Sequence, residues 1–376
     1  MSFVSFLFLG YATVYISYQC VLLYRILFCY KPVTFAATCP KPLVSILIAA
    51  RNEEECILNC LHAIEQLTYS AEYIEVWIGD DQSTDTTHNL VAAFIEDKPN
   101  FHLVSIKPST SHVKGKANVL AQLAKQARGA FFFITDADIQ VPTHWIESIL
   151  GGFEKNTGIV SGSTIVAGEG IFARIQCIDW AYACGMIHIV SEMHMPVTAV
   201  GNNMAIRRTC YEDTGGYEKL SFSVTEDLEL FIAAIHKGWG YRNLLDAGST
   251  AFTAPLKTLT DTLQQRKRWI SGAFRLPKQL VVFLAIQAMF FPVLVLAFVF
   301  IPWVWVLLFW LTIINLHNIF IEQVTHKMGV NSLRRNYILF ELNRYFFPLL
   351  LFAYYLLPLG VQWKGRTYKG REIQPK

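Results

Sequence analysis

The sequence predicts an α/β domain built on a parallel sheet, together with transmembrane helices. Between residues 44 and 135, short apolar runs typical of buried strands alternate with segments whose apolar residues recur at helical spacing. Such alternation builds a parallel sheet covered by helices. Long uncharged segments lie before and after this region. The chain is 53% hydrophobic and only 16% charged, against about 25% charged in soluble domains, which favours a membrane protein.

The strands and helices of the α/β domain can be placed in order along the chain. The strongest strand signal is the aromatic run at residues 130–135, and Gly129 ends the helix before it. Expected strands cover residues 44–50, 74–78, 102–106 and 130–135, and expected helices cover residues 53–67, 86–95, 117–127 and 225–237. Ligands bind such sheets at the carboxyl ends of the strands, so the residues that follow each strand are candidates for a site.

The first apolar region, residues 1–30, is long enough to cross a membrane and carries no charge before Arg25. It lacks the basic start and the small-residue cleavage site of a signal peptide, so we expect a retained transmembrane anchor. Residues 31 and 41, both Lys, follow this anchor, and further basic residues stand at 266–278. The positive-inside rule therefore places residues 42–278 in the cytoplasm of a protein anchored in the cell inner membrane.

The second apolar region contains no charged residue from Gln279 to Ile321, about twice the length that one crossing needs. Two transmembrane helices, 279–301 and 303–321, hinged near Pro302, fit better than one; a buried helix pair in a soluble protein is the alternative. Residues 338–360 form a third membrane segment that either crosses or lies in the interface, and residues 361–376 form a basic tail.

Two features of the composition argue against particular classes of function. The net charge of +3 is too small to indicate binding of nucleic acid. The eight cysteines show no paired metal-ligand spacing, and Cys56 and Cys60 share a helical face with apolar residues. We therefore interpret the cysteines as small core residues.

Acidic residues follow three of the predicted strands. Glu53 comes after the first strand, Asp81 after the second, and Asp136-Ala137-Asp138 after the aromatic strand. Side chains at i and i+2 of an extended segment point the same way, so Asp136 and Asp138 can hold one Mg²⁺ or Mn²⁺. Alone, such a pair is more often a solvated turn. Its place after a buried strand favours a metal site.

Three shorter motifs carry further chemistry. Thr225-Glu226-Asp227 opens a helix; Asp227 is a candidate general base, and the alternative is that both acids merely suit the helix dipole. Gly201-Asn202-Asn203 offers amides that could line an acceptor pocket. Lys116 stands at the start of a helix, where an anion is favoured, but without the spacing of a phosphate-binding P-loop.

The segment 256–278 ends the soluble region with a Gln-x-x-Arg-Trp motif. Gln265, Arg268 and Trp269 lie at i, i+3 and i+4, so a helix presents them on one face. Arginine can neutralise a diphosphate, and tryptophan can form a wall for a sugar or base. The alternative is an amphipathic interfacial helix with snorkelling cations and a Trp anchor.

In this order, the motifs resemble the membrane-bound family-2 glycosyltransferases of the cellulose-synthase-like and ceramide-glucosyltransferase-like type. The resemblance covers residues 42–275 and implies a GT-A fold (Rossmann-like, as in nucleotide-diphospho-sugar transferases) over 42–255, a nucleoside-diphosphate sugar, usually UDP-linked, and inversion at the sugar. It implies the base Asp227; the donor-binding residues Ala50, Glu53, Asp81, Lys116, Asp136, Gln265, Arg268 and Trp269; the metal ligands Asp136 and Asp138; and the acceptor-side residues Asn202, Asn203, Glu226 and Trp269.

The number of membrane segments bears on the product. One anchor before the domain and two or three segments after it offer little material for a polymer channel. We therefore expect transfer of one sugar to a lipid acceptor at the membrane surface. A processive polysaccharide synthase, with a growing glycan as acceptor, is the second hypothesis, and a catalytically silent membrane scaffold is the third. The sequence does not identify the sugar.

Overall fold

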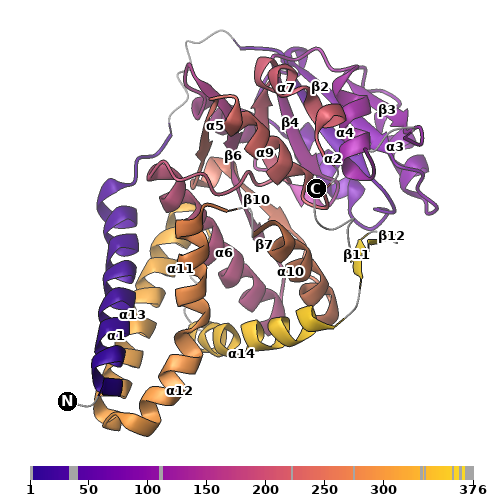
Figure 1. Cartoon of the computed structure of the whole chain (residues 1–376). Coiled ribbons are helices and arrows are strands. Elements are labelled where there is room, and N and C mark those ends of the chain that lie inside the picture. The colour runs from indigo at the N-terminus through magenta and orange to yellow at the C-terminus, as the bar shows by residue number, and fades with distance from the viewer. Residues whose placement is uncertain are drawn as a thin grey trace.

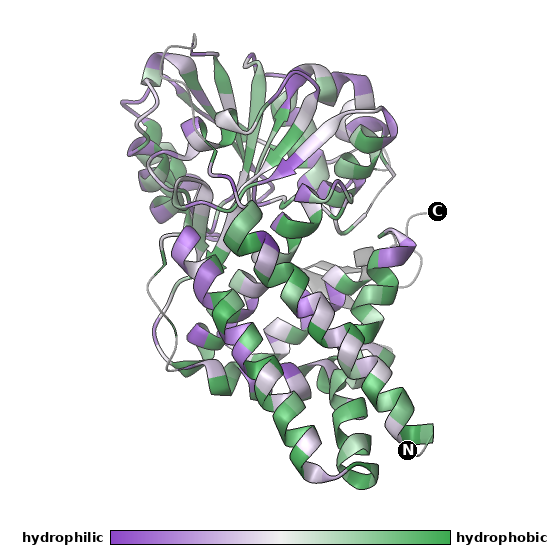
Figure 2. Cartoon of the chain, turned by 90° about the vertical axis from the view of Figure 1, so that its left-hand side faces the viewer, coloured by the Kyte–Doolittle hydropathy of each residue, from purple (hydrophilic) through white to green (hydrophobic). Residues whose placement is uncertain are grey.

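The computed structural model describes residues 3–33, 41–109, 113–221, 223–273, 276–330, 333, 336–357, 360–363 and 366–368; for residues 271–273, 361–363 and 366–368 it describes the backbone alone. An α/β domain stands at one end of the molecule and a group of long helices at the other (Figure 1). Apolar residues dominate these long helices and also form the centre of the α/β domain (Figure 2).

Seven strands form the main sheet, in the order β3-β2-β1-β4-β8-β6-β9. The four strands predicted from the sequence are mutually parallel, as expected, whereas β8 runs antiparallel to both β4 and β6. The strands are β1 Val44–Ala50, β2 Ile74–Asp80, β3 Phe101–Ser105, β4 Phe131–Asp136, β6 Thr157–Ser161, β8 Asn203–Arg207 and β9 Gly240–Asn243.

Helices cover both faces of this sheet. Alternate residues of β4 enter two separate cores: Phe131 and Phe133 pack with α2, α3 and α5, and Phe132 and Ile134 pack with α4, α7 and α9. Cys60 lies buried in the first core as a free thiol, as expected. The helices are α2 Ile57–Glu65, α3 Thr87–Ile95, α4 Lys116–Ala124, α5 Trp145–Gly151, α7 Arg208–Thr214, α8 Gly216–Lys219 and α9 Glu226–His236; two short 3₁₀ turns cover Ala71–Tyr73 and Ala247–Ser249.

A small second sheet connects the α/β domain to two helices that matter for the site. Its strands are β5 Ile139–Gln140, β10 Thr250–Thr253 and β7 Ser163–Val166, in that order. β5 follows Asp138 directly. The long helix α6, Ile171–Glu192, follows β7, and α10, Leu259–Ala273, follows β10. This sheet therefore brings the Asp136–Asp138 turn, α6 and α10 to one end of the domain (Figure 1).

Two helical segments in the described residues are long and apolar enough to cross a membrane: Phe3–Cys29, which is α1 (Phe3–Tyr24) and the π-helical turn Arg25–Cys29, and α13, Trp303–Lys327. A third span is possible if α11, Lys278–Ala288, and α12, Phe290–Phe300, count as one, although they are bent by 44°. The sequence predicted one helix here. Pro292 cannot donate to the carbonyl of Ala288 and its ring clashes with that carbonyl, so the helix breaks between them.

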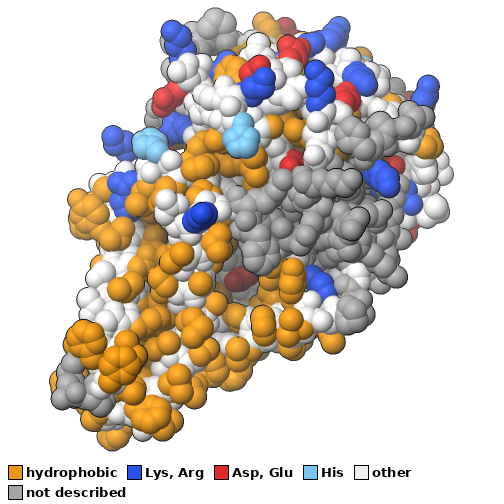
Figure 3. Space-filling view, viewed as in Figure 1, with side chains coloured by type: hydrophobic (Ala, Val, Ile, Leu, Met, Phe, Trp, Pro, Cys, Tyr) orange, Lys and Arg blue, Asp and Glu red, His pale blue; other side chains and the backbone are white. Residues whose placement is uncertain are grey.

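The remaining helix, α14, Tyr337–Leu356, runs crosswise to α1 and α13 (Figure 1). Tyr337, Phe340, Glu341 and Tyr345 are buried on one side. The opposite side exposes apolar residues that continue the hydrophobic surface of the long helices (Figure 3): Ile338, Leu342, Phe346, Leu349 and Phe352. Of the two arrangements left open by the sequence, this geometry favours the interfacial one. A short hairpin, β11 Val361–Trp363 and β12 Arg366–Tyr368, follows.

Candidate active site

A single cavity of about 890 Å³ opens at the carboxyl ends of β1, β2 and β4, between the α/β domain and α6 and α10. It brings together side chains that lie more than 200 residues apart in the sequence. Of the predicted site residues, these line it: Ala50, Glu53, Asp81, Lys116, Asp136, Asp138, Asn202, Glu226, Asp227, Gln265, Arg268 and Trp269. Only Asn203 does not.

Asn203 is a correction to the sequence analysis. Its side chain is fully buried, and both ends of the amide are occupied: Oδ1 accepts from Trp145 Nε1 at 2.8 Å, and Nδ2 donates to the carbonyls of Ser163 and Ser249. Asn203 begins β8, so it and Asn202 point in opposite directions. Asn202 lines the cavity, and its Oδ1 accepts from Thr164 Oγ1 at 3.0 Å. Asn203 therefore holds the two sheets together and makes no acceptor contact.

The loops after β1 and β2 form one bonded unit at the cavity. Asp81 donates its N–H to the carbonyl of Ala50 at 2.9 Å, and Arg51 donates Nη1 to the carbonyl of Asp81. Asn52 and Gln82 both adopt left-handed backbone conformations, with φ of 52° and 59°. Such conformations cost a non-glycine residue roughly 1 kcal/mol or more each. The fold therefore holds strained backbone at the edge of the sheet where the predicted donor residues stand.

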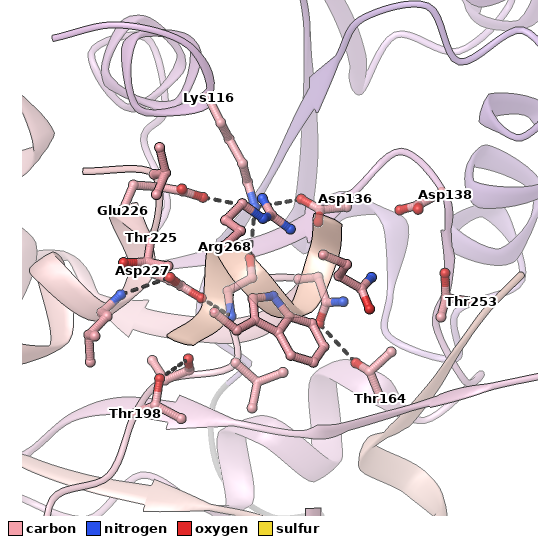
Figure 4. A pocket seen from close by; sticks show the side chains of 18 of the residues that line it. Lys116, Asp136, Asp138, Thr164, Thr198, Thr225, Glu226, Asp227, Thr253 and Arg268 are labelled. Carbon is pink, nitrogen blue, oxygen red and sulfur yellow. Dashed lines mark hydrogen bonds and ion pairs between the residues drawn. The ribbon is translucent and has the colours of Figure 1, made fainter. Parts of the chain in front are cut away.

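Lys116 links the two sides of the cavity. Its Nζ lies 2.5 Å from Oδ1 of Asp136 and 3.2 Å from Oε1 of Glu226, and it donates to the carbonyl of Gly201 at 3.2 Å. Figure 4 shows the ammonium between these two carboxylates. Burial alone would lower the pKa of Lys116, but Asp136 and Glu226 raise it above its ordinary value. The side chain is therefore a fixed positive charge.

Asp227 stands at the start of α9 and faces the cavity. Its Oδ2 accepts the N–H of Gly201 at 2.9 Å, and its Oδ1 accepts the N–H of Leu228 at 2.8 Å. Burial and the neighbouring Glu226 nevertheless raise its pKa from 3.8 to about 6, against the opposing effects of Lys116 and these two N–H groups. With a pKa near 6 the carboxyl is still ionised at neutral pH. Thr225 is the N-cap residue, but its hydroxyl pairs with Ser223 Oγ instead of the helix.

Asp136 and Asp138 offer oxygen ligands of the kind that Mg²⁺ and Mn²⁺ prefer. Both line the cavity. Among the described residues there is no group of three or more His, Cys, Asp or Glu side chains placed to hold a metal ion. Two carboxylates suit a cation that takes its other ligands from water and phosphate oxygens. The residues present therefore fit a metal that arrives with a phosphorylated ligand.

α10 presents Gln265, Arg268 and Trp269 to the cavity, as its predicted periodicity requires. Its neighbouring residue Arg266 forms an ion pair with Asp179 of α6, and its guanidinium lies 4.4 Å from the centre of the Trp269 ring. Trp269 in turn meets Trp180 of α6 edge to face at 5.3 Å. Arg266, which the sequence analysis treated only as a basic flank, therefore braces Trp269.

α10 is also tied to helix α14, through Lys267 and through Gln264, which lines the cavity as well. Lys267 Nζ donates to the carbonyls of Tyr354 and Leu357, at 3.4 and 3.0 Å, and Gln264 Nε2 donates to the hydroxyl of Tyr354 at 2.5 Å. A cation at the carboxyl end of a helix stabilises its last carbonyls. The position of α14 and the position of the cavity residues on α10 are therefore coupled through two side chains.

One wall of the cavity, formed by α6, was not predicted from the sequence. Trp180, Ala183, Cys184 and Ile187 of α6 line it, and they lie at i, i+3, i+4 and i+7. That spacing marks one face of a helix and was visible in the sequence. The residues on the opposite face of α6 are equally apolar. The periodicity of apolar residues therefore could not show which face of α6 lines the cavity and which is buried in the core.

Residues 4–374 match the model of glycosyl transferase family 21, so the chain belongs to this family. Curated relatives agree with the membrane-bound glycosyltransferases that the motifs resemble. They include beta-monoglucosyldiacylglycerol synthase of Synechocystis (26% identical over 64% of this chain and 50% of the relative), the probable glycosyltransferase YdaM of Bacillus subtilis (28%, 61% and 55%) and poly-beta-1,6-N-acetyl-D-glucosamine synthase of Staphylococcus aureus (26%, 61% and 54%). The chain spans about half the length of these relatives.

The fold has a counterpart among solved structures. The mannosyltransferase PcManGT from Pyrobaculum calidifontis, in complex with GDP-Man and Mn²⁺, aligns with a TM-score of 0.57 and 18% identity, covering 91% of this chain and 96% of its own. This match confirms the predicted glycosyltransferase fold. At such low identity it supports the fold alone.

Proposed function

We propose that the protein transfers one sugar from a nucleoside-diphosphate sugar to a hydroxyl group of a lipid at the membrane surface, with inversion at the sugar. The observation that carries this proposal is the cavity itself. The acidic strand ends, the raised-pKa carboxyl of Asp227 and the cationic face of α10 all meet in it, beside helices apolar enough for a bilayer.

The donor would lie against the sheet edge. Asp81 and the bonded loop around Ala50 would bind the nucleobase end, and the diphosphate would lie between the Asp136–Asp138 turn and α10; all of these elements line the cavity. Arg268 would neutralise charge on the departing diphosphate, where preorganised electrostatics lower the barrier most. A divalent cation held by Asp136 and Asp138 would add Lewis-acid stabilisation of the same charge. Gln265 and Trp269 would cover the bound donor.

The acceptor hydroxyl would approach Asp227. This carboxylate takes the hydroxyl proton as the oxygen attacks the anomeric carbon from the face opposite the diphosphate, whose bond to the sugar breaks. A pKa near 6 suits the task, since the group is ionised at neutral pH yet basic enough to take a proton. Glu226, held by Lys116, would fix the start of α9 on the acceptor side.

A lipid acceptor is favoured by the surroundings of the cavity. α14 exposes an apolar face beside α10, and α11 begins two residues after Leu276, which lines the cavity. Among the relatives, beta-monoglucosyldiacylglycerol synthase carries a lipid product in its name. The basic flanks would place the α/β domain in the cytoplasm, where nucleotide sugars are available.

A processive polysaccharide synthase subunit is the second candidate, favoured by the similarity to poly-beta-1,6-N-acetyl-D-glucosamine synthase. Against it stands the small number of candidate spans in the described residues, two or at most three. A silent scaffold is disfavoured because it has no need for Asp227, Lys116 and Asp136 in one cavity.

Incubation of membranes containing the full chain with radiolabelled UDP- and GDP-sugars, Mg²⁺ and Mn²⁺, followed by solvent extraction, separates these functions. Label in the organic phase, lost in Asp227→Asn, supports the proposal. Label in a water-soluble, glycosidase-sensitive polymer overturns it in favour of the synthase. No incorporation from any donor, with no difference between wild type and Asp227→Asn, indicates a scaffold.

A further inference from the structure

We propose that the hydrocarbon part of the acceptor lies against one face of α6. This face, called the wall below, is formed by Trp180, Ala183, Cys184 and Ile187. Its side chains select acceptors by the size of the apolar group nearest the hydroxyl. This inference rests on the proposed function and adds to it a specificity-determining surface.

The wall shares the cavity with the base. Asp227 from α9 and the α6 face line the same space, together with the apolar residues Val197, Ala199 and Leu276. Charged groups come from the sheet edge, α4, α9 and α10, whereas α6 itself contributes only apolar side chains and one thiol. A pocket with a polar end and an apolar end fits a molecule with the same division, a hydroxyl attached to hydrocarbon.

The opposite face of α6 is fully engaged, which makes the wall rigid. A side chain at Gly185 would come within 2.5 Å of Val324 on α13, and Tyr182 packs edge to face on Phe320 at 5.6 Å. α6 therefore lies directly between the cavity and the candidate span α13. Trp180, Ala183 and Ile187 remain half-buried on the cavity side, and this uncovered apolar surface is the surface that a ligand would cover.

The amino-terminal end of the wall is fastened to neighbouring elements by two sets of contacts. Gln176, one turn before Trp180, donates to the carbonyl of Leu256 at 3.1 Å and accepts the N–H of Leu256 at 3.0 Å, so the loop before α10 is bound to α6. Asp179 is paired with Arg266 of α10. The distance between the wall and the Arg268-Trp269 face is thus fixed by side-chain contacts.

A hydrocarbon suits this wall better than a glycan does. Trp180 could stack on a sugar ring, but Ala183, Ile187 and Val197 offer no hydrogen bonds, and the Cys184 thiol is directed to the carbonyl of Thr164 at 3.4 Å. A sugar polymer held here would leave its hydroxyls without partners. Each hydroxyl that loses water without gaining a partner weakens binding, so the wall discriminates against a glycan acceptor.

Photo-crosslinking tests the wall directly. The full chain in nanodiscs would be irradiated with a diacylglycerol that carries a diazirine on an acyl chain close to the glycerol, and the labelled peptides identified by mass spectrometry. We expect label on the segment 180–187, reduced at least threefold in Ala183→Phe and unchanged in the matched control Ala285→Phe on the exposed side of α11. Label confined to α1, α12 and α13, and equal in all three proteins, would overturn the inference.

Kinetics separates this inference from the function on which it rests. In Ala183→Phe, kcat/KM for the diacylglycerol acceptor should fall at least tenfold, while the dissociation constant of the nucleotide sugar stays within twofold and so reports intact folding. Ala183→Leu serves if the larger residue prevents expression. Equally fast transfer to lipid in wild type and variant would refute the role of the wall and leave the proposed function intact. Absence of lipid transfer in the wild type defeats the proposed function.

Discussion

The backbone of Gly201 is fitted to the carboxyl group of Asp227. The N–H of Gly201 donates to Oδ2 of Asp227 at 2.9 Å, and a methyl group on Gly201 would lie 2.4 Å from that oxygen and from Cβ of Asp227. The carbonyl of the same glycine accepts from Lys116. Gly201 thus positions the candidate base, and no larger residue fits there.

We expect Gly201→Ala to lower kcat by about 100-fold, because a shift of about 1 Å at a reacting group costs that much. The dissociation constant of the donor should change little, since the donor residues stand on other loops. The matched control is Gly10→Ala, because nothing lies within 4 Å of that position. Steady-state kinetics decides: a Gly201→Ala enzyme with half the wild-type kcat would contradict this role.

The pKa of Asp227 predicts the acid limb of the pH profile. The base acts when ionised, so kcat/KM should fall tenfold per pH unit below about pH 6. Burial is the main cause of the raised pKa, and Glu226 and Lys116 are the charged groups that face the carboxyl. An acid limb with an inflection near pH 4 would show that this carboxyl is not the base or is not desolvated.

The same shift makes a stability prediction. The folded carboxyl binds its proton more tightly than the unfolded chain does, so its contribution to stability is complete below about pH 4 and is lost as pH rises through about 6. Asp227→Asn should therefore raise the melting temperature at pH 7.5, with the difference shrinking as the pH falls and disappearing below about pH 4. A variant less stable than the wild type at pH 7.5 would refute the sign.

Substitution of Arg266 should slow sugar transfer, because its guanidinium holds the Trp269 ring in position. A desolvated cation–π contact is worth about 1–2 kcal/mol, so Arg266→Gln should lower kcat/KM by roughly 5- to 30-fold. A shift in tryptophan fluorescence should accompany it, because Trp269 loses its brace. Lys257→Gln, at an exposed ion pair with Glu55, is the control. Unchanged fluorescence and rate in Arg266→Gln would show that Trp269 is held by Trp180 alone.

Lys267 should transmit the position of α14 to the cavity. Lys267→Met removes its bonds to the carbonyls of Tyr354 and Leu357 while leaving the cavity-lining side chains unaltered. We expect faster hydrogen–deuterium exchange at the end of α14 and a several-fold lower kcat, with donor affinity retained. Exchange rates identical to those of the wild type would show that the two helices are not coupled through this residue.

Metal removal tests the Asp136–Asp138 pair. Treatment with EDTA should abolish transfer, and Mg²⁺ or Mn²⁺ should restore it. Asp138→Asn should need at least tenfold more metal for half-maximal activity, because one of two carboxylate ligands is lost. Titration of activity against free metal gives this value. Full activity in EDTA would leave Lys116 and Arg268 as the cations that act on the diphosphate.

The sequence predicted the parallel half of the sheet well because its central strands, β1 and β4, are buried on both faces and appear in the sequence as apolar runs. The acidic residues that follow the strands could be grouped into one site because the carboxyl ends of parallel strands lie at the same edge of the sheet. The break in the predicted helix 279–301 could also be predicted from the sequence, since Pro292 lies inside this segment and proline breaks the interior of a helix.

Other features depend on tertiary contacts that no local pattern encodes. Asn202 and Asn203 are chemically alike, and only the pleat of β8 decides which one faces the cavity. Arg266 and Arg268 lie two positions apart on α10 and both line the cavity, and only the presence of Asp179 on α6 shows that Arg266 also forms an ion pair there. The burial that raises the pKa of Asp227 comes from elements distant in sequence.

The product of a single reaction tests the central claim most directly. Purified full-length protein in nanodiscs would convert a lipid alcohol with an α-linked nucleotide sugar, and mass spectrometry and NMR would define the product. We expect the lipid plus one sugar residue in β linkage, absent with Asp227→Asn. A ladder of masses separated by one sugar, or an α-linked product, would contradict it.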